Sequence, residues 1–414
     1  MDGQRYTMNA RRTRFAVSFA MLALGGCRDS SDPARLGAPS FAAEDDNAAQ
    51  VVTIDHQVPY VSTVPANAGE LVHLFVRERS PSNRDARKVV LMIHGRSTPV
   101  LSGFDLSADH YDWALWLAQA GSFDVFMLDF QGSGLSPRPK MDDPCNVPVA
   151  QQSILIPNPL SATCPPSYPF QLINSRSDWD ELDAVVDYIR NLRGVDKVAL
   201  VSWSQGSFRV GPYAIQHPDK VESLLLYAPI YNPAGRPGTG PDGFGAPVAL
   251  PISGTPMTLM TRSDFMSQWD REIKCDGQRE EGIQDVVWIT TMDNDPIGRT
   301  WGPPEGVMRV RAPFLWGWNR TTVSRLSVPV LIIVGEFDLQ VELLAAHAVD
   351  SLYNTIPHAQ RLLFKVQCAG HSMVWERQRR VLHHISKEWL KHNAVDGYTT
   401  GIFFVDTEAV IHPQ

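Results

Sequence analysis

Short apolar runs alternate with amphipathic segments along most of this chain. Residues 89–93 and 330–334 are continuous apolar runs, as expected of strands that are covered on both faces. Residues 177–192 instead carry apolar side chains at helical spacing. This alternation of strand and helix predicts an α/β fold, with a mostly parallel central sheet flanked by helices. The alternating segments 51–64 and 70–77 predict two leading antiparallel strands.

The alternation stops after residue 227 and resumes at about residue 327. Residues 232–256 contain six glycines and six prolines, which no regular helix or strand tolerates. We therefore predict that residues 228–326 are a cap inserted between the sixth and seventh core strands. The core would then comprise residues 49–227 and 327–400. Five of the eleven tryptophans lie in the predicted cap, at Trp269, Trp288, Trp301, Trp316 and Trp318. We expect most of them to form a small core of the cap, and one or two to face a pocket.

The overall composition excludes one large class of function. The chain has 414 residues, of which 43 % are hydrophobic and 20 % charged, so it is long and apolar enough to build a full hydrophobic core. Its net charge is −8, and the sequence shows no basic run beyond the N-terminus. Nucleic-acid binding needs a basic face that neutralises phosphates, so we do not expect it here.

The N-terminus has the pattern of an export signal. Four arginines precede the apolar run 15–24, which is too short to span a bilayer but suits a secretory signal peptide. The run ends in Leu-Gly-Gly-Cys27, which resembles a bacterial lipobox, so residues 1–26 would be removed and Cys27 lipidated. The alternative is an ordinary signal peptide with a chance cysteine. Residues 27–48 predict a flexible tether. We expect an exported lipoprotein, anchored to a membrane in the periplasm or at the cell surface, and otherwise a secreted protein.

Four further cysteines follow Cys27 in the sequence. In an exported protein they allow two disulfides, with three possible connectivities. Cys145 and Cys164 flank a Pro-rich loop without a helical or strand period, and a bridge would close that loop. Our preferred pairing is therefore Cys145–Cys164 and Cys275–Cys368, with free buried thiols as the alternative. The cysteine spacing fits no familiar zinc pattern, and we predict neither a metal nor a cofactor.

A candidate nucleophile lies where the apolar run 198–203 meets a helical segment. Ser204 has small residues two positions to either side, Ser202 and Gly206, as a tight strand–serine–helix turn requires. Ser202 is rejected as the nucleophile because Leu200 would occupy one of those small positions. The alternative interpretation makes Ser204 only the N-cap of the following helix.

A candidate acid and a candidate base follow two later strands. Asp338 comes just after the apolar run 330–334, and His371 lies in a loop between the predicted strand 361–366 and the final helix. In an open α/β sheet, ligands and chemistry gather at the carboxyl ends of the strands. Glu336, two residues before Asp338, stays open as the alternative acid.

These residues and their chain order resemble the α/β-hydrolase superfamily, whose catalytic residues follow in the order Ser, Asp or Glu, His. The resemblance covers roughly residues 50–395. The motifs that carry it are His94-Gly95, Ser202–Gly206, Gly335–Asp338, Gly370-His371 and the D-x-x-G-x-G-x-S turn at residues 129–136. The chain looks most similar to the capped serine esterases, lipases and aminopeptidases. Ser202 departs from the glycine that most members have at that position.

The resemblance implies a role for each of these residues. Ser204 would attack a carbonyl carbon, with His371 as the general base and Asp338 orienting it. The backbone N–H groups of Gln205 and Arg96 would form the oxyanion hole. The Arg96 side chain could bind a substrate carboxylate or form a structural salt bridge, and the sequence leaves both open. We expect His94 to be a structural residue of the oxyanion loop.

Three functions remain open from the sequence. The first is a serine hydrolase of carboxylic esters that forms an acyl-enzyme, and the second is an exopeptidase or amidase. In an exopeptidase an acidic cap residue would bind the amino terminus of the substrate. The candidates for that acid are Glu272, Asp276, Glu280 and Glu281. The third function is a non-catalytic surface lipoprotein that uses the fold for binding. The expected partner is a small-molecule ester or a peptide, together with the membrane that holds the anchor.

Overall fold

The computed structural model describes residues 50–414, apart from residues 83–87, 109 and 122. The predicted signal peptide, the lipidation site Cys27 and nearly all of the tether lie outside the described residues. All of the described residues belong to one compact unit.

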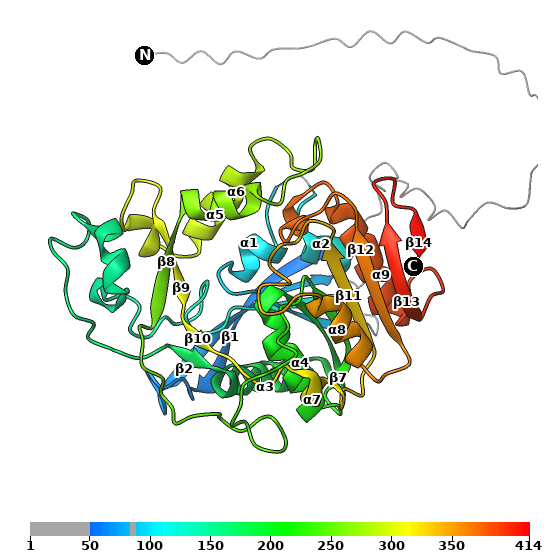
Figure 1. Ribbon diagram of the computed structural model, residues 1–414, viewed down its shortest axis with the longest axis horizontal. Coiled ribbons are helices and arrows are strands. Elements are labelled where there is room, and N and C mark those ends of the chain that lie inside the picture. Colours follow the sequence, from blue (N-terminus) through cyan, green and yellow to red (C-terminus); the bar gives the residue numbers. More distant parts are fainter. Residues whose placement is uncertain (1–49, 83–87, 109, 122) are drawn as a thin grey trace, which may run out of the picture. The chain divides into compact units, whose positions relative to one another are not determined.

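A ten-stranded sheet forms the centre of this unit (Figure 1), in the order β1-β2-β4-β3-β6-β7-β11-β12-β13-β14. From β4 to β13 all neighbouring strands are parallel, whereas β1 and β2 at one edge and β14 at the other run antiparallel to their neighbours. The strands are β1 (Val51–Val61), β2 (Leu71–Pro81), β3 (Val89–Ile93), β4 (Asp124–Leu128), β6 (Val198–Trp203), β7 (Val221–Tyr227), β11 (Val330–Gly335), β12 (Arg361–Val366), β13 (Thr400–Val405) and β14 (Ile411–Pro413). The predicted α/β fold, with its two leading antiparallel strands, is confirmed.

The burial of the strands follows their sequence pattern. Every residue of β3, β6 and β11 is buried, as their unbroken apolar runs predict. At the other end of the chain, β13 and β14 extend the sheet past residue 400, where the sequence analysis predicted no strand. β14 has only three residues, and only part of β13 is buried, so the apolar signal of this edge is weak.

Helices cover both faces of the sheet. Figure 1 shows α2 and α9 on one side and α3 and α4 on the other. The α2–α9 contact includes a hydrogen bond from Trp113 Nε1 to Ser386 Oγ (3.0 Å). A capping box of Asn174 and Ser177 begins α3, and Gly194 ends it at a φ of 65°. The helices are α1 (Val100–Phe104), α2 (Trp113–Gly121), α3 (Ser175–Arg193), α4 (Ser207–Gln216), α5 (Arg262–Asp270), α6 (Ile283–Asp293), α7 (Arg320–Val323), α8 (Ala348–Thr355) and α9 (Arg379–His392).

The segment between β7 and β11, residues 228–326, is called the insertion below. It contains α5, α6 and α7 and the antiparallel strands β8 (Met257–Thr261) and β9 (Val307–Arg311). Its short strand β10 (Pro313–Phe314) pairs with β5 (Ile173–Asn174). All five tryptophans of the insertion are buried.

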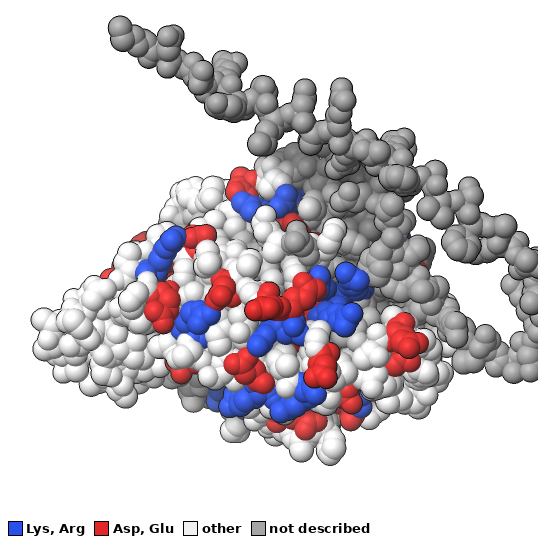
Figure 2. All heavy atoms as spheres, turned by 90° about the horizontal axis from the view of Figure 1, so that it is seen from above, with Lys and Arg blue, Asp and Glu red and all other residues white. Residues whose placement is uncertain are grey.

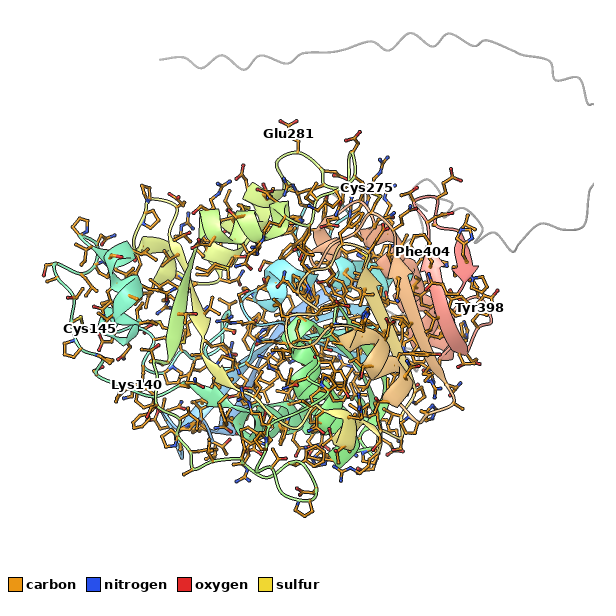
Figure 3. The ribbon with its side chains drawn as sticks, in the orientation of Figure 1. Lys140, Cys145, Cys275, Glu281, Tyr398 and Phe404 are labelled. Carbon is orange, nitrogen blue, oxygen red and sulfur yellow. A yellow bond between two sulfur atoms is a disulfide. The ribbon has the colours of Figure 1, made fainter. Side chains whose placement is uncertain are left out.

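A second excursion, residues 139–172, leaves the sheet after β4 and packs against the insertion. Gln151 and Leu259 exchange two hydrogen bonds, of 3.0 and 2.8 Å. Residues 144–172 contain no Asp, Glu, Lys or Arg, and Figure 2 shows an uncharged lobe at the left, on the side where Figure 3 labels Cys145. The excursion belongs to the predicted core range 49–227, and these hydrogen bonds join it to the insertion as well.

Two disulfides are present, Cys145–Cys164 and Cys275–Cys368, with Cα–Cα distances of 5.4 and 5.7 Å. The preferred pairing is therefore confirmed. Disulfides persist in oxidising compartments, so this pair indicates an exported protein. Within the described ranges, we find no helix with the length and apolar character that crossing a membrane requires.

Candidate active site

The serine turn at the end of β6 has the geometry of a strained elbow. Ser204 has a φ of 57°, a left-handed conformation that costs energy for any residue with a side chain. The chain then passes through one 3-10 turn, Ser204–Gly206, directly into α4. A Cβ on residue 206 would lie 3.0 Å from the carbonyl oxygen of Ile93, so the turn requires glycine there. This local crowding explains the small residues around Ser204.

The loop after β3, which is predicted to supply one half of the oxyanion hole and is called the oxyanion loop below, lies directly beside Ser204. A Cβ on Gly95 would lie 3.1 Å from the Cβ of Ser204, so glycine allows this close approach. His94 is buried, and its ring contacts Gly95 through Nδ1 with the backbone oxygen (2.7 Å) and Phe130 through Nε2 with the backbone N–H (3.3 Å). Burial, followed by the nearby Arg209 charge, lowers the pKa of His94 well below its usual value. His94 is thus a neutral structural residue of the loop, as expected.

A buried arginine that the sequence analysis missed holds the oxyanion loop in place. Arg209 of α4 donates from Nη1 to the backbone oxygens of His94 (2.6 Å) and Gly95 (3.2 Å). Its Nε donates to Asp178 Oδ2 (2.8 Å), and Asp178 also pairs with Arg311. Arg209 and Asp178 are almost completely inaccessible to solvent. Arg209 is a charged residue within the largely apolar start of α4. This is the sequence signal that could have indicated its network with Asp178 and Arg311.

His371 and Asp338 form a buried pair at the ends of β12 and β11. His371 Nδ1 lies 2.9 and 3.0 Å from the two carboxylate oxygens of Asp338. The N–H groups of Gln340 (2.9 Å) and Val341 (3.2 Å) donate to Asp338 Oδ1 and fix the carboxylate. Burial alone would lower the pKa of His371, but the Asp338 charge and hydrogen bond outweigh it, so this pKa is raised. The charge of Asp338 therefore stabilises the protonated form of His371.

Glu336, the alternative acid, lies elsewhere. It is exposed, and its Oε2 accepts a hydrogen bond from the N–H of Cys368 (3.1 Å). The structure thus pairs His371 with Asp338 rather than with Glu336.

Aromatic residues at the ends of β6 and β7 hold the backbone of His371. Trp203 Nε1 (3.1 Å) and the Tyr227 hydroxyl (2.6 Å) both donate to the carbonyl oxygen of His371. The same hydroxyl accepts from the N–H of Val374 (3.1 Å). These aromatics occupy the carboxyl ends of neighbouring strands, which is a signal that the sequence analysis did not use.

The insertion also holds the histidine loop, through Glu272. This carboxylate is 1 % exposed and accepts from the N–H of His371 (2.7 Å) and from the N–H of Leu339 (3.2 Å). One side chain of the insertion therefore ties together the loop that carries the acid and the loop that carries the base. Burial and the Asp338 charge raise the pKa of Glu272.

A second buried carboxylate reinforces the same connection. Glu376 accepts from the N–H of Gly370 (2.9 Å) and from two side chains of the insertion, Trp269 Nε1 (2.9 Å) and Gln278 Nε2 (3.0 Å). Burial raises the pKa of Glu376 to about 7. The disulfide Cys275–Cys368 joins the same two segments covalently.

Ser204 and His371 line one cavity of about 430 Å³. The oxyanion loop contributes Gly95 and Arg96 to its wall, and the insertion contributes apolar side chains, among them Phe265 and Trp269. The structure therefore brings Ser204, His371 and the predicted oxyanion loop to one site, with Asp338 directly behind His371. In the described part of the chain, no cluster of His, Cys, Asp and Glu suits a metal ion.

Comparisons with known proteins agree with this fold. The model of the alpha/beta hydrolase fold family matches residues 88–246. A serine hydrolase of the polyaromatic-hydrocarbon-degrading bacterium Cycloclasticus zankles shares 13 % identity, with a TM-score of 0.50 over 83 % of this chain and 98 % of that one. A thermophilic esterase of Thermogutta terrifontis shares 15 % identity, with a TM-score of 0.48 over 81 % and 98 %. No curated protein sequence matches the chain.

The sheet order, the strand–serine–helix turn and the family match agree on one fold. The chain therefore has the α/β-hydrolase fold.

Proposed function

We propose that this protein is a serine hydrolase of carboxylic esters, with Ser204, His371 and Asp338 as its catalytic triad. One observation carries the proposal: the buried His371, which is paired with Asp338, lines the same cavity as a serine held at positive φ. A serine hydroxyl is a weak nucleophile, so catalysis requires it to be exposed on a strained turn beside an oriented base.

The geometry supports a two-stage mechanism. His371 Nε2 takes the proton of Ser204 as the hydroxyl attacks the ester carbonyl, because Nδ1 is engaged with Asp338. The N–H groups of Gln205 and Arg96 stabilise the oxyanion. His371 then protonates the leaving alcohol, and an acyl-enzyme forms on Ser204. Water, activated by the same histidine, releases the acid and restores the serine.

In this proposal the insertion is the cap of the active site, placed between the sixth and seventh core strands, over a core of residues 49–227 and 327–400. Met260, Phe265 and Trp269 of the insertion line the cavity that holds Ser204. Such a wall suits an apolar acyl or alcohol group.

The exopeptidase alternative needs a cap acid that is free to bind an amino terminus. Of the four candidates, only Glu272 lines the cavity, and both of its oxygens accept from backbone N–H groups. Glu280 pairs with Arg379, Asp276 lines a separate cavity, and Glu281 points away from the body of the protein (Figure 3). These positions favour an ester over a peptide substrate. A binding protein without catalysis would not need Ser204, His371 and Asp338 arranged together, so this arrangement also disfavours the third function.

A substrate panel tests the proposal. Purified protein is assayed on 4-nitrophenyl acyl esters and on aminoacyl 4-nitroanilides, alongside Ser204→Ala. We expect ester turnover in the wild type and a loss of about 10⁴-fold or more in kcat for the variant. Turnover confined to free-amine anilides would favour the exopeptidase, and an active Ser204→Ala variant would contradict the triad.

The export pattern adds a membrane anchor to the proposal. Cleavage before Cys27 and lipidation of this residue would leave the hydrolase tethered by residues 27–48. Metabolic labelling with palmitate should mark the wild type and leave Cys27→Ser unlabelled. Labelling of both proteins would contradict lipidation at Cys27.

A further inference from the structure

Ser204 lines two cavities. Besides the cavity of about 430 Å³ that is lined by His371, Ser204 lines a second one of about 340 Å³. Four residues line both cavities: Arg96, Ser204, Gln340 and Leu343. An ester bound at Ser204 extends in two directions from its carbonyl, so the two cavities can take its two parts.

The second cavity has a mixed lining. Its polar residues are Arg96 and Arg236, Ser204 and the amides of Gln205, Asn232 and Gln340. The remaining six residues are apolar, and the lining contains no Asp or Glu. Because the charged groups of this wall are two guanidinium groups, it is suited to an anionic group on an apolar chain rather than to a cation.

Arg96 has no partner among the described residues. Arg96 is exposed at the cavity, and none of its nitrogens takes part in an ion pair or a hydrogen bond within the described ranges. Partial desolvation lowers its pKa, and no neighbouring carboxylate offsets this effect. Arg236 donates to the oxygen of Leu315 (2.7 Å) and stacks on Phe314, again without a described carboxylate. The salt bridge left open for Arg96 by the sequence is therefore absent from the described part of the chain.

Arg96 differs from the buried arginines Arg209, Arg309 and Arg379, which each pair with a carboxylate. Arg96 is exposed, and it is a cation beside the proposed nucleophile with its hydrogen-bonding capacity free. The guanidinium group matches a carboxylate in shape and can bind it through two parallel hydrogen bonds.

We propose that Arg96, assisted by Arg236, binds a carboxylate carried by the substrate, so that the preferred substrates are anionic esters. The carboxylate is carried either by the acyl group, as in a half-ester of a dicarboxylic acid, or by the alcohol, as in an ester of a hydroxy acid. The backbone N–H of Arg96 contributes to the proposed oxyanion hole, so its side chain reaches an anion only a few bonds from the reacting carbonyl. This inference rests on the proposed ester hydrolysis.

The test compares pairs of esters that differ in charge. For the acyl side the pair is 4-nitrophenyl hemiglutarate and the neutral 4-nitrophenyl hexanoate. For the alcohol side it is 3-acetoxybenzoate and phenyl acetate. The readout is the ratio of kcat/KM, anionic over neutral, within each enzyme, so that any effect of a substitution on the oxyanion hole cancels. We expect a ratio above about 10 in the wild type for one pair, and which pair shows it identifies the part of the substrate that carries the charge.

Arg96→Gln should lower that ratio by about tenfold or more, and Arg96→Lys should retain part of it. Arg299→Gln is the matched control, because it removes an exposed positive charge in the insertion that pairs only with Asp293, and its ratio should stay at the wild-type value. A wild-type ratio of one or less for both pairs, or an unchanged ratio in Arg96→Gln, would overturn the inference.

A binding measurement separates this inference from the proposed function. Glutarate is titrated calorimetrically into Ser204→Ala and into the double variant Ser204→Ala/Arg96→Gln, so that turnover plays no part. We expect the Kd to rise by about tenfold in the double variant. Equal Kd values, or no binding to either protein, would overturn anion recognition even if esters are hydrolysed. Tight binding without ester turnover would contradict only the proposed reaction.

Discussion

The two halves of the candidate site are held in different ways. The serine elbow and the oxyanion loop are supported from within the core, where Arg209 and Asp178 fix the carbonyls of His94 and Gly95. The histidine loop is supported in large part from the insertion, through Glu272 and the disulfide Cys275–Cys368. The geometry of Ser204, the proposed nucleophile, therefore depends on the core of the fold. The geometry of His371, the proposed base, depends also on a segment far away in the sequence.

The difference has a consequence for the insertion, which we propose to be a cap. A segment that is bonded to the histidine loop by a disulfide and by buried carboxylates cannot move away at that end without disturbing His371. If the insertion opens as a cap, we expect the opening at the β8–β9 end, away from Cys275.

The largest predicted effect concerns the core half. Arg209→Met removes the donor to two loop carbonyls and leaves Asp178 with Arg311 alone. Breaking a buried pair in this way costs about 3–5 kcal/mol of unfolding free energy. Denaturant unfolding measures this cost. Arg299→Gln, which breaks a pair exposed on both sides, should change it by less than about 1 kcal/mol. Similar losses in the two variants would contradict the role of Arg209.

The second prediction compares the two disulfides. Replacing either pair with serines should cost roughly 2–4 kcal/mol of stability. Only the loss of Cys275–Cys368 should also lower kcat/KM well below the melting temperature, because that bridge joins the insertion to the histidine loop, whereas Cys145–Cys164 closes the outlying excursion. Equal activity losses in the two variants would show that the histidine loop does not depend on its bridge.

The third prediction concerns Glu272 as a positioning residue. Glu272→Gln replaces one of two accepting oxygens with a donor that faces a backbone N–H, and we expect kcat/KM to fall by about tenfold or more. The Glu272 charge also raises the pKa of His371, so the rise of kcat/KM with pH should shift to lower pH in this variant.

Glu281→Gln is the control for Glu272, because Glu281 is exposed and points away from the body. Its pH profile should match that of the wild type. A reduced rate in Glu272→Gln with an unshifted profile would mean that Glu272 contributes packing alone.

The smallest prediction concerns pH and Glu376. Burial raises the pKa of Glu376 from 4.5 to about 7 in the folded protein, so the folded state binds this proton more tightly than the unfolded state. Its contribution to stability is therefore full below about pH 4.5 and is lost as the pH rises to about 7. Glu376→Gln cannot lose this proton. Its Tm should therefore fall less than that of the wild type between about pH 4.5 and 7, by about 2 °C or more. An unchanged pH dependence of Tm would show that Glu376 does not bind the proton.

The features predictable from sequence were those encoded by neighbouring residues. Ser204, Asp338 and His371 each follow an apolar strand, and each lies where the strand pattern placed it. The residues that hold them were harder to predict. Glu272 contacts His371 across 99 positions and Arg209 contacts Gly95 across 114, and no periodicity or local motif encodes such pairs. The sequence neighbours of Glu272 suggest a charged surface. They therefore allow Glu272 as a ligand for an amino terminus but do not reveal its contact with the histidine loop.

The central claim is that Ser204 is the nucleophile of an acyl-enzyme mechanism. Brief incubation with a fluorophosphonate, followed by intact-mass and peptide mass spectrometry, tests it most directly. We expect one phosphonyl adduct per chain, on Ser204, in the wild type. The adduct should be absent from Ser204→Ala and should form more slowly in His371→Ala. An adduct on another residue, or equal labelling of Ser204→Ala, would contradict it.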